Sequence, residues 1–263
     1  MSTPTFWRDD ALPFLEARAI ADGRGVCYAK HSHDTFSIGS ITGGESTYLN
    51  GRAREQVGAG TVVLMNPGDV HACNPLGAQP WSYRMFHVDS RWLAEAQGRD
   101  AFQPYATVAS RAPGLFARLE ALYATCVDRD AGALEKHGAA LDFFTSLHDV
   151  LQPAPATPRP DHQVRRAAEY LRDHLAGTPS LDDLCAATGL SPSYLIRAFK
   201  ARYGMTPHAW LVDCRIRYCR EQLRRGRPIA DVALAAGFAD QAHLQRAFKR
   251  HVAATPGQYR KGR

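Results

Sequence analysis

The sequence predicts an α+β protein with a small all-β domain, two helices that follow it, and an all-helical C-terminal domain. Three observations predict this class. Residues 26–89 contain short β-like segments separated by glycine-rich turns, residues 113–151 change to helical periodicity, and the residues after 161 contain one helical motif twice. A chain of 263 residues is long enough for two domains of ordinary size.

The first domain is expected to span residues 1–112. Its strand-like segments are separated by turn sequences such as GG, NG and NPGD. Short strands at a spacing of roughly 8–12 residues are typical of a β-sandwich or β-barrel. The clearest predicted strands are Phe36–Ile41, Ser46–Asn50, Thr61–Met65 and Trp81–Val88.

A helical segment over residues 113–151 is predicted to follow, with Asp130–Gly132 separating two amphipathic helices. Each helix has an apolar stripe that must be buried on the β domain or on a second subunit. A homodimer interface is therefore expected in this segment. The stripes consist of Leu115, Leu119, Leu122 and Tyr123 in the first helix and of Leu141, Phe144, Leu147, His148 and Leu151 in the second.

A linker is predicted at residues 152–161, which read QPAPATPRPD. Proline fixes φ and stops helix propagation, so this stretch is expected to be extended and semi-rigid. The charge balance changes sign at the same point. Residues 1–160 hold 14 Lys and Arg against 17 Asp and Glu, a net charge of −3, whereas residues 161–263 hold 18 against 9, a net charge of +9. A basic C-terminal domain is typical of a protein that binds DNA, although a solvated arginine-rich surface would have the same charge.

The composition excludes several classes of protein. No run of about eighteen apolar residues occurs, so no membrane span is expected. The N-terminus lacks the basic-then-apolar order of a secretory signal, and a cytoplasmic location is therefore expected. The six cysteines are scattered without a CxxC pair, which predicts neither a disulfide framework nor a zinc knot.

The most specific feature of the sequence is a duplication within residues 162–263. Leu195-Ile-Arg-Ala-Phe-Lys200 recurs as Leu244-Gln-Arg-Ala-Phe-Lys249 at an offset of 49, and Gly189 matches Gly237 at an offset of 48. Two copies are too few for a solenoid, so a repeat used only for packing or protein binding is the weaker interpretation. The copies are expected to span residues 162–203 and residues 207–260, the second including a connecting helix.

Each copy has the pattern of a helix-turn-helix motif. A glycine permits the positive φ of the turn, and Ser191 or Asp240 then caps the second helix. Two apolar residues four positions apart face inward, which leaves a cationic and polar face outward, as a reader of the DNA major groove requires. The outward residues are Ser193, Ile196, Arg197 and Lys200 in the first copy and Gln241, Ala242, Gln245, Arg246 and Lys249 in the second.

The connecting helix is predicted over residues 207–225. About nineteen residues form a helix of about 28 Å, and successive major grooves on one DNA face are about 34 Å apart. One chain is therefore expected to read two adjacent grooves. The helix carries five arginines, some of which are expected to pair with Asp213 or Glu221 and others to touch phosphates. These arginines are Arg215, Arg217, Arg220, Arg224 and Arg225.

Residues 162–260 resemble the DNA-binding domain of the AraC/XylS family of bacterial transcription regulators. The resemblance covers the whole domain, including Ile229-Ala-Asp-Val-Ala-Leu-Ala-Ala-Gly-Phe238 and the closing Thr255-Pro256-x-x-Tyr259-Arg260. It implies a regulator that binds double-stranded DNA. In the family the base-contacting positions lie on the third and sixth helices, which here match Ser193, Ile196, Arg197, Gln241, Ala242, Gln245 and Arg246.

The resemblance further implies an effector-responsive regulator and not an enzyme. Activation is the commoner mode in the family, so an activator that recruits RNA polymerase is expected. Ile196 and Ala242 can contact thymine methyl groups but donate no hydrogen bond, so the first copy depends mainly on Arg197. The second copy carries two glutamines and an arginine and is expected to offer more hydrogen-bond readout.

The β domain contains four histidines that resemble part of a cupin barrel, which members of the family use as a sensor domain. Metal-binding cupins add a glutamate after the His-x-His motif, and positions 34–41 contain none. A metal-free pocket without a cofactor, which binds a small organic effector, is therefore expected. The predicted effector-binding residues are His31, His33, His71, Tyr83 and His87.

Two other functions are consistent with the same residues. The first is a dioxygenase-like cupin metalloenzyme fused to a DNA-binding domain, in which the histidines hold iron or manganese. The second is a constitutive architectural DNA-binding protein whose β domain is purely structural.

Overall fold

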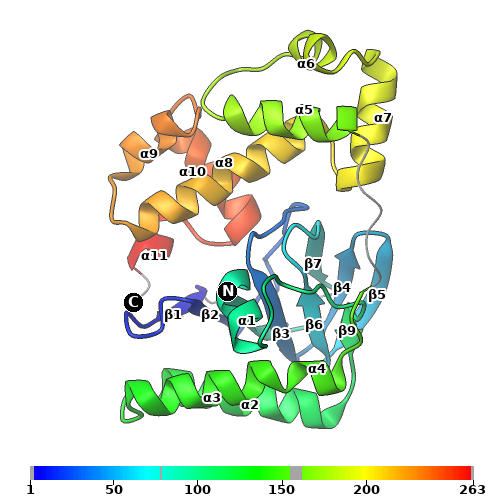
Figure 1. Cartoon of the computed structure of the whole chain (residues 1–263). Coiled ribbons are helices and arrows are strands. Elements are labelled where there is room, and N and C mark those ends of the chain that lie inside the picture. The colour runs from blue at the N-terminus through cyan, green and yellow to red at the C-terminus, as the bar shows by residue number, and fades with distance from the viewer. Residues whose placement is uncertain (1–2, 78, 155–161, 262–263) are drawn as a thin grey trace. The chain divides into compact units, whose positions relative to one another are not determined.

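The computed structural model describes residues 3–77, 79–154 and 162–261. The chain divides into two compact parts, a β unit that contains all the described strands and α1–α4, and a helical unit that contains α5–α11 (Figure 1). Most of the predicted linker, residues 155–161, lies outside the described residues. Its first residues pair with an earlier loop, since Ala154 N–H donates to the Pro104 carbonyl at 2.7 Å.

Two antiparallel sheets form the β unit. In the six-stranded sheet the order is β1 (Thr5–Arg8), β2 (Leu15–Ile20), β8 (Ser82–Val88), β3 (Phe36–Gly43), β6 (Val62–Met65) and β9 (Ala109–Ser110). In the three-stranded sheet the order is β5 (Ala53–Gly58), β4 (Glu45–Asn50) and β7 (His71–Pro75). Buried side chains join the two sheets: the Tyr48 hydroxyl donates to the Leu64 carbonyl at 2.6 Å, and Asn50 Nδ2 donates to the same carbonyl at 2.9 Å.

The outer face of the six-stranded sheet is covered by four helices: α1 (Ser90–Ala96), α2 (Pro113–Val127), α3 (Ala133–Thr145) and α4 (Leu147–Val150). Helices α2 and α3 lie side by side (Figure 1). They bury their apolar faces in one core cluster with the sheet, as predicted for the first stripe. The cluster includes Phe36, Ile38, Phe86, Val88, Leu115, Leu119, Leu122, Phe143, Phe144 and Leu147.

The predicted stripe of α3 is wrong at one position. Leu141 is 43% exposed, and Phe143 faces the core instead, beside Phe144, which was predicted to be buried. The helix is rotated so that the larger aromatic rings are buried, because they remove more apolar surface from water than a leucine does. An apolar face of α3 therefore remains exposed, with Leu134 at 88%.

The described residues of the helical unit form seven helices: α5 (His162–Asp173), α6 (Leu181–Thr188), α7 (Pro192–Tyr203), α8 (Pro207–Arg224), α9 (Ile229–Ala235), α10 (Gln241–Val252) and α11 (Pro256–Lys261). The connecting helix, predicted over residues 207–225, is α8 and ends one residue earlier, whereas no helix was predicted at α11. We call α6 with α7 the first reader and α9 with α10 the second reader. Within this unit α8 contacts both readers (Figure 1). None of the described helices is long and apolar enough to cross a membrane.

Candidate functional site

The turns of the two readers have the geometry that their glycines predict. Gly189 has a φ of 72° and Gly237 a φ of 75°, both in the left-handed region that costs a glycine little. A capping box fixes the start of α6, since the Ser180 hydroxyl accepts from Asp183 N–H while the Asp183 carboxylate accepts from Ser180 N–H. These bonds to Ser180 lower the pKa of the Asp183 carboxyl. In the first reader the capping box thus fixes the start of α6, and Gly189 permits the turn that leads into α7.

In the first reader, α7 is anchored by two fully buried side chains. Leu195 and Phe199 are both 0% exposed, and the Phe199 ring lies 6.0 Å from the Trp210 ring on α8 in an edge-on arrangement. Pro192 occupies the first turn, where its missing N–H leaves no bond unmade. The residues between these anchors on the helix surface therefore face solvent.

In the second reader, α10 repeats this arrangement with a stronger cap. Leu244 and Phe248 are 0% exposed, and the Phe248 ring lies 5.5 Å from the Tyr259 ring on α11. The Asp240 carboxylate accepts from the His243 backbone N–H at 2.6 Å. Ser191, which occupies the matching position before α7, makes no side-chain bond to its helix.

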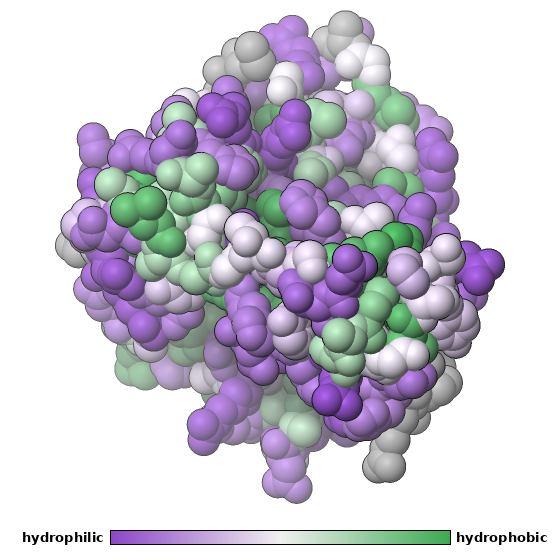
Figure 2. Space-filling view, turned by 90° about the horizontal axis from the view of Figure 1, so that it is seen from above, coloured by the Kyte–Doolittle hydropathy of each residue, from purple (hydrophilic) through white to green (hydrophobic). Residues whose placement is uncertain are grey.

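All nine residues predicted to contact DNA are exposed. Helix α8 connects α7 to the second reader and packs against both α7 and α10. On the face of the molecule in Figure 2, hydrophilic residues predominate and hydrophobic ones gather in small separate groups. The exposed residues are Ser193, Ile196, Arg197, Lys200, Gln241, Ala242, Gln245, Arg246 and Lys249.

The difference between the two caps predicts a difference in stability. Replacing Asp240 with alanine is expected to destabilise the helical unit by about 1 kcal/mol, because it removes the bond to an otherwise unpaired helix N–H. Ser191→Ala is the matched control and is expected to cost well under half as much. Urea unfolding of both variants measures this, and equal costs would mean that the Asp240 bond contributes nothing.

The arginines of α8 have several roles. Two predicted ion pairs are confirmed, since Arg225 Nη2 lies 2.5 Å from Glu221 Oε1 and Arg217 Nε lies 3.6 Å from Asp213 Oδ2. Arg215, predicted to pair with a carboxylate or a phosphate, is instead buried against backbone carbonyls. Burial lowers the pKa of its guanidinium. No sequence pattern marks this role, because the partners are main-chain atoms.

Three of the histidines predicted to bind the effector lie together in the β unit. The His33 ring centroid is 4.8 Å from that of His71 and 4.7 Å from that of His87, and all three are buried. His71 Nδ1 donates to the Asp69 carbonyl at 2.9 Å, which leaves Nε2 as the ligand atom of a neutral ring. His87 Nδ1 lies 2.9 Å from the Ser37 hydroxyl. The ligand nitrogens of His33 and His71 lie within 4.8 Å of each other. Two imidazoles at this separation suit a transition metal as well as a polar effector.

The other two predicted effector residues, Tyr83 and His31, are also buried. Tyr83 is buried with its ring 4.8 Å from that of Trp81. His31 belongs to the short segment Tyr28–His31, which groups with the helical unit, and its Nδ1 donates to the Ala29 carbonyl at 2.8 Å.

Charged residues of β1 and β2, which the sequence did not single out, share a face with His87. Glu16 stands directly opposite His87 across the β2–β8 pair, so the two side chains project on the same side of the sheet. Glu16 Oε2 accepts from Arg8 Nε at 2.7 Å, and Glu16 is almost fully buried. The Arg18 guanidinium lies 5.8 Å from the Tyr83 ring. No sequence motif identified these residues, because it is the strand register that brings them to the same face of the sheet as His87.

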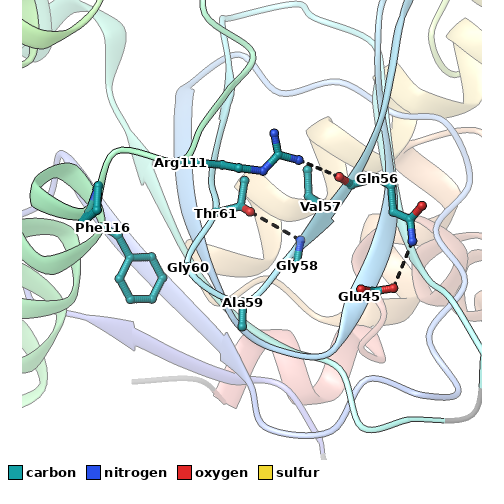
Figure 3. A pocket seen from close by; sticks show the side chains of 10 residues that line it. Glu45, Gln56, Val57, Gly58, Ala59, Gly60, Thr61, Arg111 and Phe116 are labelled. Carbon is teal, nitrogen blue, oxygen red and sulfur yellow. Dashed lines mark hydrogen bonds between the residues drawn. The ribbon is translucent and has the colours of Figure 1, made fainter.

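A pocket of about 620 Å³ opens elsewhere on the β unit, at the β5–β6 turn and the start of α2 (Figure 3). The Arg111 guanidinium borders it and donates to the Gln56 carbonyl at 3.0 Å, while Gln56 Nε2 donates to Glu45. The Phe116 ring forms an apolar wall. The pocket combines a cation, a carboxylate and an aromatic ring, and none of these residues was predicted to bind a ligand.

Known proteins match both units. A family model described as an AraC-like ligand binding domain matches residues 14–148, and one described as a helix-turn-helix domain matches residues 184–262. The HTH-type transcriptional regulator YbfI of Bacillus subtilis is 30% identical over 226 residues, which cover 82% of this chain and 81% of that protein.

Two further proteins are similar to one unit or to the fold. The arabinose operon regulatory protein of Escherichia coli is 36% identical over 107 residues, 40% of this chain and 37% of its own length. The crystal structure of ToxT from Vibrio cholerae has a TM-score of 0.56 at 10% identity, covering 94% of this chain and 97% of that one. The order of a sheet domain followed by a helix-turn-helix region is thus a known arrangement.

Proposed function

Since this chain belongs to the AraC family of transcription regulators, we propose that its two readers bind adjacent major grooves on one face of double-stranded DNA. The protein is a DNA-binding regulator with a ligand-binding domain. The observation that carries the proposal is the exposure of all the outward residues on α7 and α10, two helices packed on one connecting helix. Helix α8 has 18 residues and is about 27 Å long, close to the distance of about 34 Å between successive grooves.

In this proposal the two readers differ in chemistry. Arg197 supplies the first reader with a bidentate donor suited to guanine, while Gln245 and Arg246 give the second reader donors for adenine and guanine. Lys200 and Lys249, near the ends of the recognition helices, contact phosphates. Selection of duplexes from a random pool tests this, and we expect two conserved elements of which the second is more sharply defined. Enrichment of no common sequence would contradict it.

For the β unit we propose a small polar organic effector, bound beside the His33, His71 and His87 trio. The pocket at Arg111 is the rival site. A ligand found by thermal-shift screening of metabolites is expected to raise the unfolding temperature of the wild-type protein by mass action. His71→Gln is expected to abolish this shift and Arg111→Ala to preserve it. If Arg111→Ala abolishes the shift and His71→Gln preserves it, the effector binds in the pocket of Figure 3 instead.

We also propose that the protein is not an enzyme, because its curated relatives are transcription regulators by name. The alternative is a metalloenzyme that uses the imidazoles of His33 and His71. Metal analysis of the purified protein distinguishes the two, since a tightly held stoichiometric transition metal would favour the alternative. A protein without such a metal is expected.

A homodimer through α3 is the proposed assembly. Leu134 and Leu141 are exposed and seven residues apart, so they lie on one helix face, and Gly138 between them leaves open space. Leu134→Asp with Leu141→Asp is expected to convert the dimer to a monomer in sedimentation velocity. Glu135→Ala on the same helix is the control. A double variant that remains dimeric would place the interface elsewhere.

We propose an activator that works in the cytoplasm and contacts RNA polymerase from a promoter-proximal site. The support is its kinship with transcription regulators. Genomic footprinting combined with transcript measurement, with and without the effector, tests the sign of regulation. Transcripts beside occupied sites that rise when the protein is removed would make it a repressor.

A further inference from the structure

One buried arginine joins the two readers within the helical unit. Arg215 lies in the middle of α8 and is 8% exposed. Its Nε donates to the Leu175 carbonyl at 2.9 Å, and its Nη2 donates to the Gly177 carbonyl at 2.5 Å. Both carbonyls lie in the loop between α5 and α6, which leads into the first reader. The guanidinium therefore ties α8 to this loop.

The same guanidinium touches the turn of the second reader. Its central carbon lies 5.8 Å from the Phe238 ring centroid. A Cβ placed on Gly237 would come within 2.9 Å of Arg215 Nη2 and within 2.6 Å of the Ala176 carbonyl oxygen. The α9–α10 turn thus packs directly on the backbone of the α5–α6 loop, with Arg215 between them.

The matching turn of the first reader has no such contact among the described atoms. Gly189 has nearly the same φ as Gly237, yet a Cβ there would meet just the Gln163 Nε2 atom at 4.0 Å. Both glycines are required for a left-handed turn. Gly237 is required in addition because another part of the helical unit approaches its backbone. The two turns therefore match in sequence and in φ but differ in the contacts around their glycines.

We propose that Arg215 and Gly237 fix the angle between the two readers, so that the protein selects the spacing of its two DNA elements as well as their sequences. We call the contact that Arg215, Gly237 and Phe238 make with the backbone of Leu175–Gly177 the Arg215 clamp. Arg215 is a positioning residue, because its donors are directed at the protein interior. A guanidinium holds two acceptors in one plane, which the point charge of a lysine cannot do. The inference rests on the proposed function, since spacing matters only if both readers bind together.

The test uses the full-length protein and three DNA duplexes. The first duplex is the one selected from a random pool by the wild type, the second has about five base pairs inserted between its elements, half a helical turn, and the third has one element scrambled. Competition between duplexes in one protein preparation gives affinity ratios that do not depend on the folded fraction. We expect the wild type to prefer the selected spacing by at least about tenfold, because linked binding events reinforce one another only when the geometry fits.

Arg215→Met and Gly237→Ala are expected to reduce this spacing preference below about threefold while changing affinity for the single-element duplex by less than about threefold. Gly189→Ala is the matched control. It imposes the same backbone strain without disturbing the clamp, so it is expected to retain the wild-type preference. Arg215→Lys is expected to have a spacing preference between those of the wild type and Arg215→Met. If Arg215→Met does not fold, the affinity ratios of Arg215→Lys and Gly237→Ala test the proposal.

Two outcomes overturn the inference, and they are distinguishable. If the wild type prefers its selected spacing and the clamp variants prefer it equally, the clamp alone is wrong. If the wild type binds all three duplexes with equal affinity, the proposal that two readers bind together is wrong, and the proposed role of the clamp is wrong with it.

Discussion

Replacing Phe248 with alanine is expected to destabilise the helical unit by about 3–5 kcal/mol, the cost of removing a fully buried aromatic ring. The ring is 0% exposed and packs against Tyr259, and it anchors α10 to the rest of the unit. A cavity at this point would release α10 from its position, and DNA binding by the second reader would be lost. Urea unfolding followed by circular dichroism measures the stability, and competition binding measures the affinity for DNA.

Lys249→Ala provides the control for this prediction, because Lys249 is adjacent in the chain and exposed. It is expected to leave the unfolding free energy unchanged within about 0.5 kcal/mol and to weaken binding to all DNA sequences alike. A cost below about 1 kcal/mol for Phe248→Ala would mean that the ring is not a structural anchor.

Arg246→Ala is expected to remove about 1–3 kcal/mol of discrimination at one base pair within the second element, without unfolding the protein. Arg246 is exposed on α10 beside Gln245 and has the forked donor geometry that recognises guanine. The measurement is the affinity for the selected duplex and for every single substitution of its second element. The variant is expected to accept several bases at one position where the wild type accepts one.

Arg197→Ala should produce the same kind of loss in the first element and none in the second. Because the first reader depends mainly on this arginine, the variant is expected to lose most of its discrimination between bases in the first element. Lys200→Ala is the control and should weaken all duplexes equally with a smaller salt dependence. If both arginine variants protect the wild-type sequence with unchanged affinity, then α7 and α10 are not the recognition helices.

Local signals explain why the readers could be predicted from the sequence. Gly189, Pro192 and Asp240 determine turns and helix starts through backbone conformation alone, and the spacing of Leu244 and Phe248 determines which face is buried. These effects act over a few residues. The bounds of α8 therefore followed closely from the sequence.

Other features depend on contacts between distant segments. The sequence did not mark β1 and β2 as strands, and the position of Glu16 opposite His87 depends on register. Leu141 was predicted to be buried because it fits a helical stripe, but the rings of its neighbours compete for the same core. Arg215 is a further case, since its acceptors are carbonyls that carry no sequence signature.

Methylation protection of guanine N7 on the selected duplex tests the two-reader account most directly, because N7 lies in the major groove. Two protected clusters per protomer are expected, about one helical turn apart on one face of the DNA. Arg246→Ala is expected to remove protection from one cluster and Arg197→Ala from the other. A single protected cluster per protomer, or two clusters that both disappear with either variant alone, would contradict it.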